Sequence, residues 1–183
     1  MTRFLGHAGL AAISILVLGG CVDSVGPILT DAQAVFGPKL RLQLYTLRKG
    51  YAQDPEQAAF LWKDSRYIRS GGGLRDVASF TLHPFEDGDF IIQEMPVKRP
   101  HITEYALLHK VADATYQVEA IDEEDADAAT RAAHCGQGDK KDPSPCRIRT
   151  REQLFAFAHA TAARKKQDGA LAIRLPDTSS NRR

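Results

Sequence analysis

The sequence predicts an α+β protein in which an antiparallel meander sheet of about six strands, curved or barrel-like, packs with two helices. Between residues 40 and 121, short runs of alternating apolar and polar residues are separated by turn residues, which is typical of strands that bury one face. After residue 121 the sequence becomes rich in alanine and the apolar spacing becomes helical. The composition, with 43% hydrophobic and 26% charged residues, is typical of one globular domain.

Two strands are expected in the first part of this sheet. Three leucines alternate with polar residues from Leu40 to Leu44, so the first strand continues to about Arg48. A second strand is predicted over residues 60–68, and the glycine run Ser70–Gly73 ends it. We interpret this run as a flexible turn and not as a phosphate-binding loop, because no helical pattern follows it.

Four further strands complete the meander. Asp87-Gly88 is a favoured pair for a tight hairpin turn, and it joins strands predicted over residues 77–85 and 89–95. Two more strands are expected over residues 103–111 and 115–121. Short strands that follow one another at this spacing indicate antiparallel neighbours.

Two helices are predicted in the last third of the chain. The first covers residues 122–133, where acidic residues occupy a first turn that the helix dipole favours. A calcium loop is not expected at these acids, because its alternating oxygen ligands are missing. Thr150 and Gln153 match a capping box at the start of the second helix, and a short strand over residues 170–173 follows it. The buried stripe of this second helix is expected to contain Leu154, Phe157, Ala158, Thr161 and Ala162.

The first 21 residues carry the pattern of an export signal. Arg3 precedes an apolar run that is shorter than the roughly 20 residues needed to span a bilayer, and two glycines follow the run. Leu18-Gly19-Gly20-Cys21 resembles the lipobox of bacterial lipoproteins. The resemblance implies cleavage before Cys21 and attachment of diacylglycerol to its thiol. A simple secretory cut that leaves Cys21 as a free thiol is the alternative.

The resemblance also implies a domain organisation and a location. Residues 1–20 would be a lipoprotein signal peptide, residues 21–38 the lipidated N-terminus and a tether, residues 39–176 a single α+β domain, and residues 177–183 a flexible tail. Two or three acyl chains hold a protein firmly in a membrane. An aspartate directly after the lipidated cysteine would resemble an inner-membrane retention signal, but residue 22 is valine. We therefore expect the outer membrane, with the domain facing the periplasm.

Two cysteines are left when Cys21 takes the lipid. Cys135 and Cys146 flank a polar run rich in glycine and proline, which can bend back on itself. Thiols in an oxidising compartment usually pair, so we expect a disulfide that stabilises the fold by about 3 kcal/mol in the chain-entropy model. A metal site at His134 and these two cysteines is the alternative, but further ligands at a zinc spacing are missing. No metal and no cofactor are therefore expected.

The remaining patterns limit the class of function. The formal net charge of +1 gives no field that would attract nucleic acid, so nucleic-acid binding is not expected. No histidine or serine lies in a known catalytic motif, and His83 and His109 are interpreted as strand-end and surface residues. We therefore expect that the protein is not an enzyme, although a search for sequence motifs does not detect a catalytic site that forms only on folding.

The expected function is a non-catalytic interaction or scaffold module of the cell envelope, bound to the membrane through Cys21 and to a partner protein of the envelope. Two alternatives are open. A curved sheet could close over an apolar cavity and carry a small ligand. An enzyme with an unrecognised site is the second alternative.

Overall fold

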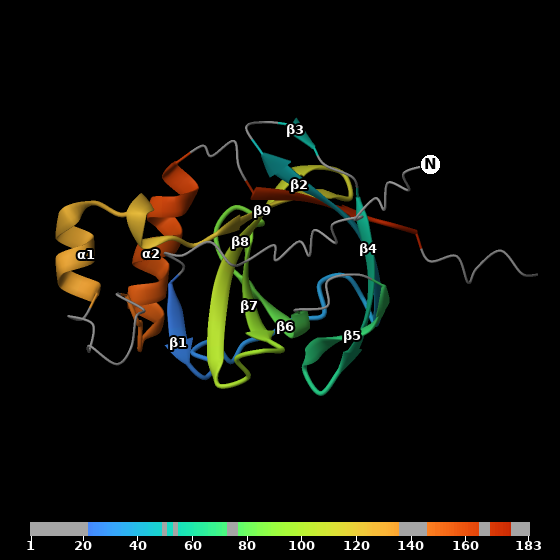
Figure 1. Cartoon of the computed structure of the whole chain (residues 1–183), viewed down its shortest axis with the longest axis horizontal. Coiled ribbons are helices and arrows are strands. Elements are labelled where there is room, and N and C mark those ends of the chain that lie inside the picture. Colours follow the sequence, from blue (N-terminus) through green and yellow to red (C-terminus); the bar gives the residue numbers. More distant parts are fainter. Residues whose placement is uncertain are drawn as a thin grey trace, which may run out of the picture.

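The computed structural model describes residues 22–48, 51–52, 55–72, 77–135, 146–164 and 169–176. Ten strands in these ranges form one antiparallel sheet, and eight of them close into a barrel (Figure 1). The barrel strands, in order, are β2 (Lys39–Arg48), β4 (Glu56–Lys63), β5 (Arg66–Gly72), β6 (Val77–Pro84), β7 (Phe90–Pro96), β8 (Ile102–Ala112), β9 (Thr115–Ala120) and β10 (Gly169–Arg174).

Each barrel strand pairs with the next one along the chain, so the predicted antiparallel meander is confirmed. The ring closes because β10 lies between β9 and β2 and pairs with both. The sheet is therefore barrel-like, as expected, but it has more strands than the six that the sequence predicts.

The largest difference from the prediction lies in residues 60–68. They do not form one strand, because the chain turns at Asp64-Ser65 and divides them between β4 and β5. Asp64 and Ser65 have φ angles of 52° and 58°, as a two-residue hairpin turn with two positive φ angles requires. Asp-Ser is a much weaker sequence signal for this turn than Asp-Gly.

The glycine run is also different from the expected flexible turn. Gly71 and Gly72 lie inside β5 and pair with β4 next to a register shift. A Cβ atom on Gly72 would lie 2.2 Å from the backbone oxygen of Gln57, so glycine permits the close approach of the two strands. Gly73 lies outside the described residues.

Two short strands extend the barrel wall. β1 (Asp23–Val25) pairs with the beginning of β8, beyond the end of β9, and β3 (Tyr51–Ala52) pairs with the end of β2. The segment assigned to a tether therefore contributes a strand, and it also buries Val22, Leu29 and Phe36. At least residues 22–36 of the expected tether are packed against the domain.

All eight barrel strands contribute to the core inside the barrel. Large aromatic side chains fill it: the ring centroids of Phe60 and Phe80 are 4.9 Å apart, and those of Tyr67 and Phe80 are 5.2 Å apart. The Phe36 N–H donates to the Tyr67 hydroxyl, and the Phe36 ring contacts Tyr116, so the chain before β2 covers one end of the interior.

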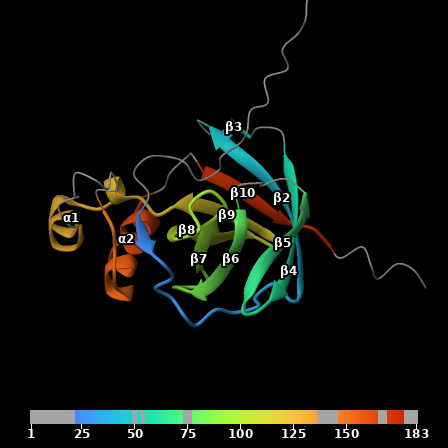
Figure 2. The same ribbon diagram turned by 60° about the horizontal axis from the view of Figure 1, so that its bottom comes forward.

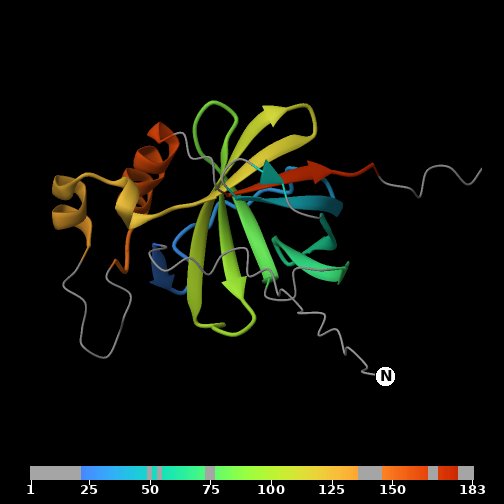
Figure 3. The ribbon, with the colours of Figure 1, turned by 45° about the horizontal axis from the view of Figure 1, so that its top comes forward.

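The second core lies between the outer face of the barrel and the helices, which occupy one side of the molecule (Figures 1 and 2). The helix predicted over residues 122–133 is a 3-10 turn, η1 (Glu123–Asp125), followed by α1 (Ala128–His134). The second helix is α2 (Arg151–Ala163), and the view of Figure 3 also places it between α1 and the barrel. Within the described ranges, no helix has the length and apolar character needed to cross a membrane.

Helix α2 begins as predicted. Thr150 and Gln153 form a capping box, in which each side chain bonds the backbone N–H of the other residue. Four members of the expected stripe are buried. Leu154, Phe157 and Ala158 share the second core with outward-facing residues of β7 and β8, and the Thr161 hydroxyl donates to the carboxylate of Asp125 at 3.1 Å. The fifth member, Ala162, is exposed and lies one residue before the end of the helix.

We expect Phe157→Ala to reduce the free energy of unfolding by about 3–5 kcal/mol, because Phe157 is completely buried in the second core. Chemical denaturation of the purified protein measures this loss. Phe155→Ala removes the same ring from a half-buried position on the same helix, and a smaller loss is expected. Equal effects of the two variants would contradict the buried position of Phe157.

Candidate functional site

The structure places His83 in a polar cluster on the outer face of β6, in which His83 is buried and Asp31 is exposed. His83 is the penultimate residue of β6, so its expected place at a strand end is confirmed, but its side chain is 1% exposed, so the expected surface position is wrong. The physical reason is the N-terminal segment, which crosses the outside of β6 and bonds to it: the Gln33 N–H donates to the backbone oxygen of Leu82 at 2.9 Å. We call Asp31, Thr81 and His83 the relay.

The three relay residues are joined by two short hydrogen bonds. His83 Nδ1 lies 2.8 Å from Asp31 Oδ1, and His83 Nε2 lies 2.7 Å from Thr81 Oγ1. Thr81 and His83 are two positions apart on one strand, so their side chains point to the same face. The other carboxylate oxygen of Asp31 lies 3.3 Å from Arg151 Nη1 at the start of α2, which holds the carboxylate from a second side.

The surroundings determine the protonation states of the relay. Burial lowers the pKa of His83, and the hydrogen bond with Asp31 opposes this effect. The hydrogen bond from His83 lowers the pKa of Asp31. A neutral imidazole that donates its Nδ1–H to a carboxylate leaves Nε2 as an acceptor, so the Thr81 hydroxyl donates to Nε2.

Gln93 on β7 holds the N-terminal segment over the relay. Its Oε1 accepts from the backbone N–H groups of Ile28 and Leu29 at 3.0 and 2.9 Å. Its Nε2 donates to the Leu29 oxygen at 3.1 Å and to Thr81 Oγ1 at 3.2 Å. Three of these contacts join Gln93 to the distant residues 28 and 29, so they fasten the N-terminal segment to the barrel wall.

One end of the relay opens on a surface hollow of about 60 Å³. Thr81 is half-buried at this hollow, whereas His83 is covered. A single water needs roughly 10–15 Å³ of such space, so the hollow accepts a group of only a few heavy atoms. The lining residues are Pro27, Arg66, Ser79, Phe80, Thr81, Gln93 and Met95.

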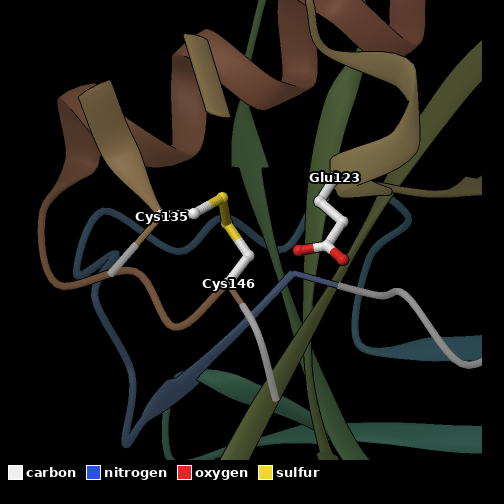
Figure 4. Close-up of side chains that lie close together, drawn as sticks. All are labelled: Glu123, Cys135 and Cys146. Carbon is white, nitrogen blue, oxygen red and sulfur yellow. A yellow bond between two sulfur atoms is a disulfide. The ribbon is translucent and has the colours of Figure 1, made fainter. Parts of the chain in front are cut away.

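The cysteines form a second cluster (Figure 4). Cys135 and Cys146 are joined by a disulfide with a Cα–Cα distance of 4.4 Å, so the predicted pairing is confirmed. The carboxylate of Glu123 approaches them, and one of its oxygens and both sulfur atoms lie within 4.8 Å of one another. Zinc binds cysteine as a thiolate, and the sulfurs of a disulfide are not thiolates, so the oxidised pair offers no such ligands.

The other residues named from the sequence have separate positions. His134 does not join the disulfide cluster as a ligand, and its ring faces Phe157 at a centroid distance of 6.4 Å. His109 is exposed, as expected, and it pairs with Asp89. Cys21 and the rest of the segment that resembles a lipobox lie outside the described residues.

Comparisons with protein-family models, with curated proteins and with solved structures find no match to this chain. Any function assigned to the relay therefore has to be argued from its geometry alone. Sequence reasoning missed Asp31 and Thr81, since only folding brings Asp31 to a histidine 52 positions away. The Thr-x-His spacing within a predicted strand was the one available signal, because it places both side chains on one face.

The relay predicts a loss of stability on acidification. The folded pKa of His83 is below its ordinary value of 6.5, so the unfolded chain binds more protons there and the free energy of unfolding falls as the pH drops below about 6.5. The lowered pKa of Asp31 reduces the free energy of unfolding further, but only at pH values below 3.8, the ordinary pKa of an aspartate. Denaturation curves between about pH 8 and pH 5 measure the first effect.

A pair of variants tests whether His83 causes this slope. His83→Gln should flatten the pH profile in this range, because the buried titrating group is gone. His109→Gln removes an exposed histidine and should keep the slope of the parent protein. A slope that survives His83→Gln unchanged would assign the pH dependence to another group.

Proposed function

We propose that this chain is a lipid-anchored protein of the cell envelope that acts as an interaction module for another envelope protein. The lipobox at Leu18–Cys21 supports the anchor, with the outer membrane as the location and the domain facing the periplasm. The Cys135–Cys146 disulfide supports an oxidising compartment, since disulfides persist in the periplasm and are rare in the cytosol.

The observation that carries this proposal is the position of Val22. Its side chain is completely buried, and its N–H donates to the backbone oxygen of Ile121 at 3.0 Å. One residue of extended chain spans at most roughly 3.6 Å, so an acylated Cys21 would follow the surface of the domain without a spacer. The anchor would then hold the barrel against the membrane in a restricted set of orientations.

Such an anchor suits a protein that presents a surface. Restriction to the membrane raises the effective concentration toward other envelope proteins, so a modest contact area is sufficient for association. The part of the barrel wall remote from β1 would face the periplasm and meet the partner. Nucleic acid is not proposed as a partner, because the net charge of +1 provides no attraction.

The packing of the barrel favours this function over the carrier of a small ligand. An eight-stranded barrel is just wide enough to be filled by side chains or to hold one small ligand. Here Phe60, Tyr67 and Leu82 are almost completely buried inside the ring and belong to one continuous core with residues from the opposite strands. A ligand would have to displace these side chains.

Replacement of the acyl acceptor tests the anchor. Cys21→Ser should block lipid attachment, so the protein should remain an uncleaved precursor or move to the soluble fraction. Membrane fractionation and intact-protein mass spectrometry measure both outcomes. A variant that still partitions with membranes at the mass of the parent would show that Cys21 carries no lipid.

A second pair of replacements serves as the control for that experiment. Cys135→Ser combined with Cys146→Ser also removes thiols, but it leaves the lipobox intact. This variant should keep the lipid and the membrane fraction while it loses the disulfide. If both the single and the double variant leave the membrane, the effect comes from instability of the domain and contradicts a specific role of Cys21.

A further inference from the structure

We propose that Thr81, His83 and Asp31 act as nucleophile, general base and orienting carboxylate, and that the hollow beside Thr81 is an acyl-transfer site for esters of small carboxylic acids. This activity goes beyond the proposed interaction role and does not depend on the lipid anchor. The site lies on the outer face of the barrel wall, under the edge of the N-terminal segment.

The distances fit this assignment. A nucleophile and its base need heavy-atom separations of roughly 2.6–3.2 Å, and a third group must orient the base. The distance from Thr81 Oγ1 to His83 Nε2 is 2.7 Å, and that from His83 Nδ1 to Asp31 Oδ1 is 2.8 Å. Such triads are recognised by geometry and roles and not by the order of residues in the chain.

The charges also fit the assignment. A buried imidazole that is neutral near pH 7 can accept a proton at Nε2, whereas a protonated one cannot. Asp31 is an ionised carboxylate that accepts the Nδ1–H, and it can stabilise the imidazolium that forms when His83 takes a proton. Arg151 contacts its second oxygen and so fixes the direction of the carboxylate.

The hollow supplies access and limits the substrate. Thr81 and the half-buried Arg66 both line the hollow. A guanidinium at this place can stabilise the negative charge that develops on an ester oxygen during attack. The volume of about 60 Å³ suits a short acyl group such as acetyl and excludes a long fatty chain.

The reaction is a two-step transfer. Thr81 Oγ forms a bond to the ester carbonyl carbon, and its proton moves to His83 Nε2. The bond from the carbonyl carbon to the alcohol oxygen breaks, and His83 returns the proton to that oxygen, which leaves acyl-Thr81 and a free alcohol. Water then attacks the acyl group with His83 again as the base, which releases the carboxylic acid and restores the Thr81 hydroxyl.

Hydrolysis of 4-nitrophenyl acetate by the purified full chain in detergent tests this site. Nitrophenolate release should exceed that of buffer, and mass spectrometry after a short reaction should locate an acetyl group on Thr81. The rate should rise with pH as the imidazolium of His83 loses its proton. A parent protein with no activity above buffer, or with acetyl groups only on other residues, overturns the proposal.

Variants separate a catalytic role from a structural one. Thr81→Val keeps the shape of the side chain and removes the hydroxyl, so we expect a loss of about 100-fold, whereas Thr81→Ser should retain activity. Asp31→Asn should lower the rate as well. Thr115→Val, at another half-buried strand threonine, should leave the rate unchanged.

Folding of each variant is followed by circular dichroism, which keeps the test independent of stability. If Thr81→Val fails to fold, the location of the acetyl group in the parent protein decides alone. A folded Thr81→Val variant that hydrolyses the ester at the parent rate overturns the proposal. Such a result would not contradict the proposed lipid anchor, because the anchor is tested by membrane fractionation and not by esterase activity.

Discussion

Closure of the barrel by β10 is the constraint on which the rest of the structure depends. β10 inserts between β9 and β2, so both of its edges are hydrogen-bonded and the ring has no open edge there. Its first residue needs to be glycine: Gly169 has φ 142°, and a Cβ atom would lie 2.7 Å from the Val118 backbone oxygen. Because β10 follows the helices in the chain, the segment from η1 to α2 must leave the ring after β9 and return to it, which places both helices outside the barrel.

The position of the helices explains the apolar character of both faces of β7 and β8. Alternate residues point into the barrel, and the others would be exposed on an isolated ring. α2 covers Ile91 and Leu107, whereas the N-terminal segment covers His83 and Gln93. The wall formed by β6, β7 and β8 is thus covered on both faces, by the barrel core inside and by α2 and the N-terminal segment outside. Its outward-facing polar side chains must therefore form hydrogen bonds within the protein. The relay and the Gln93 amide satisfy that requirement.

Local signals were sufficient for the parts of this fold that depend on neighbouring residues. The hairpin at Asp87-Gly88, the capping box and the disulfide follow from short-range chemistry, and the structure contains all three. The turn at Asp64-Ser65 was missed because neither residue is glycine, although both adopt positive φ. The docked N-terminal segment was missed because its small and polar residues have no periodicity, and burial of such a segment depends on a surface that forms only after the barrel closes.

The same segment connects the two parts of the protein to which we assign a function. It starts beside Cys21, its first residues pair with β8, and further along it supplies Asp31 to His83. The relay is therefore complete only while the segment is docked on the barrel. Undocking of the segment around Asp31 would separate Asp31 from His83, so by linkage the hydrogen bond between these two residues opposes undocking. Docking of the N-terminal segment and the geometry of the relay are in this way coupled parts of one equilibrium.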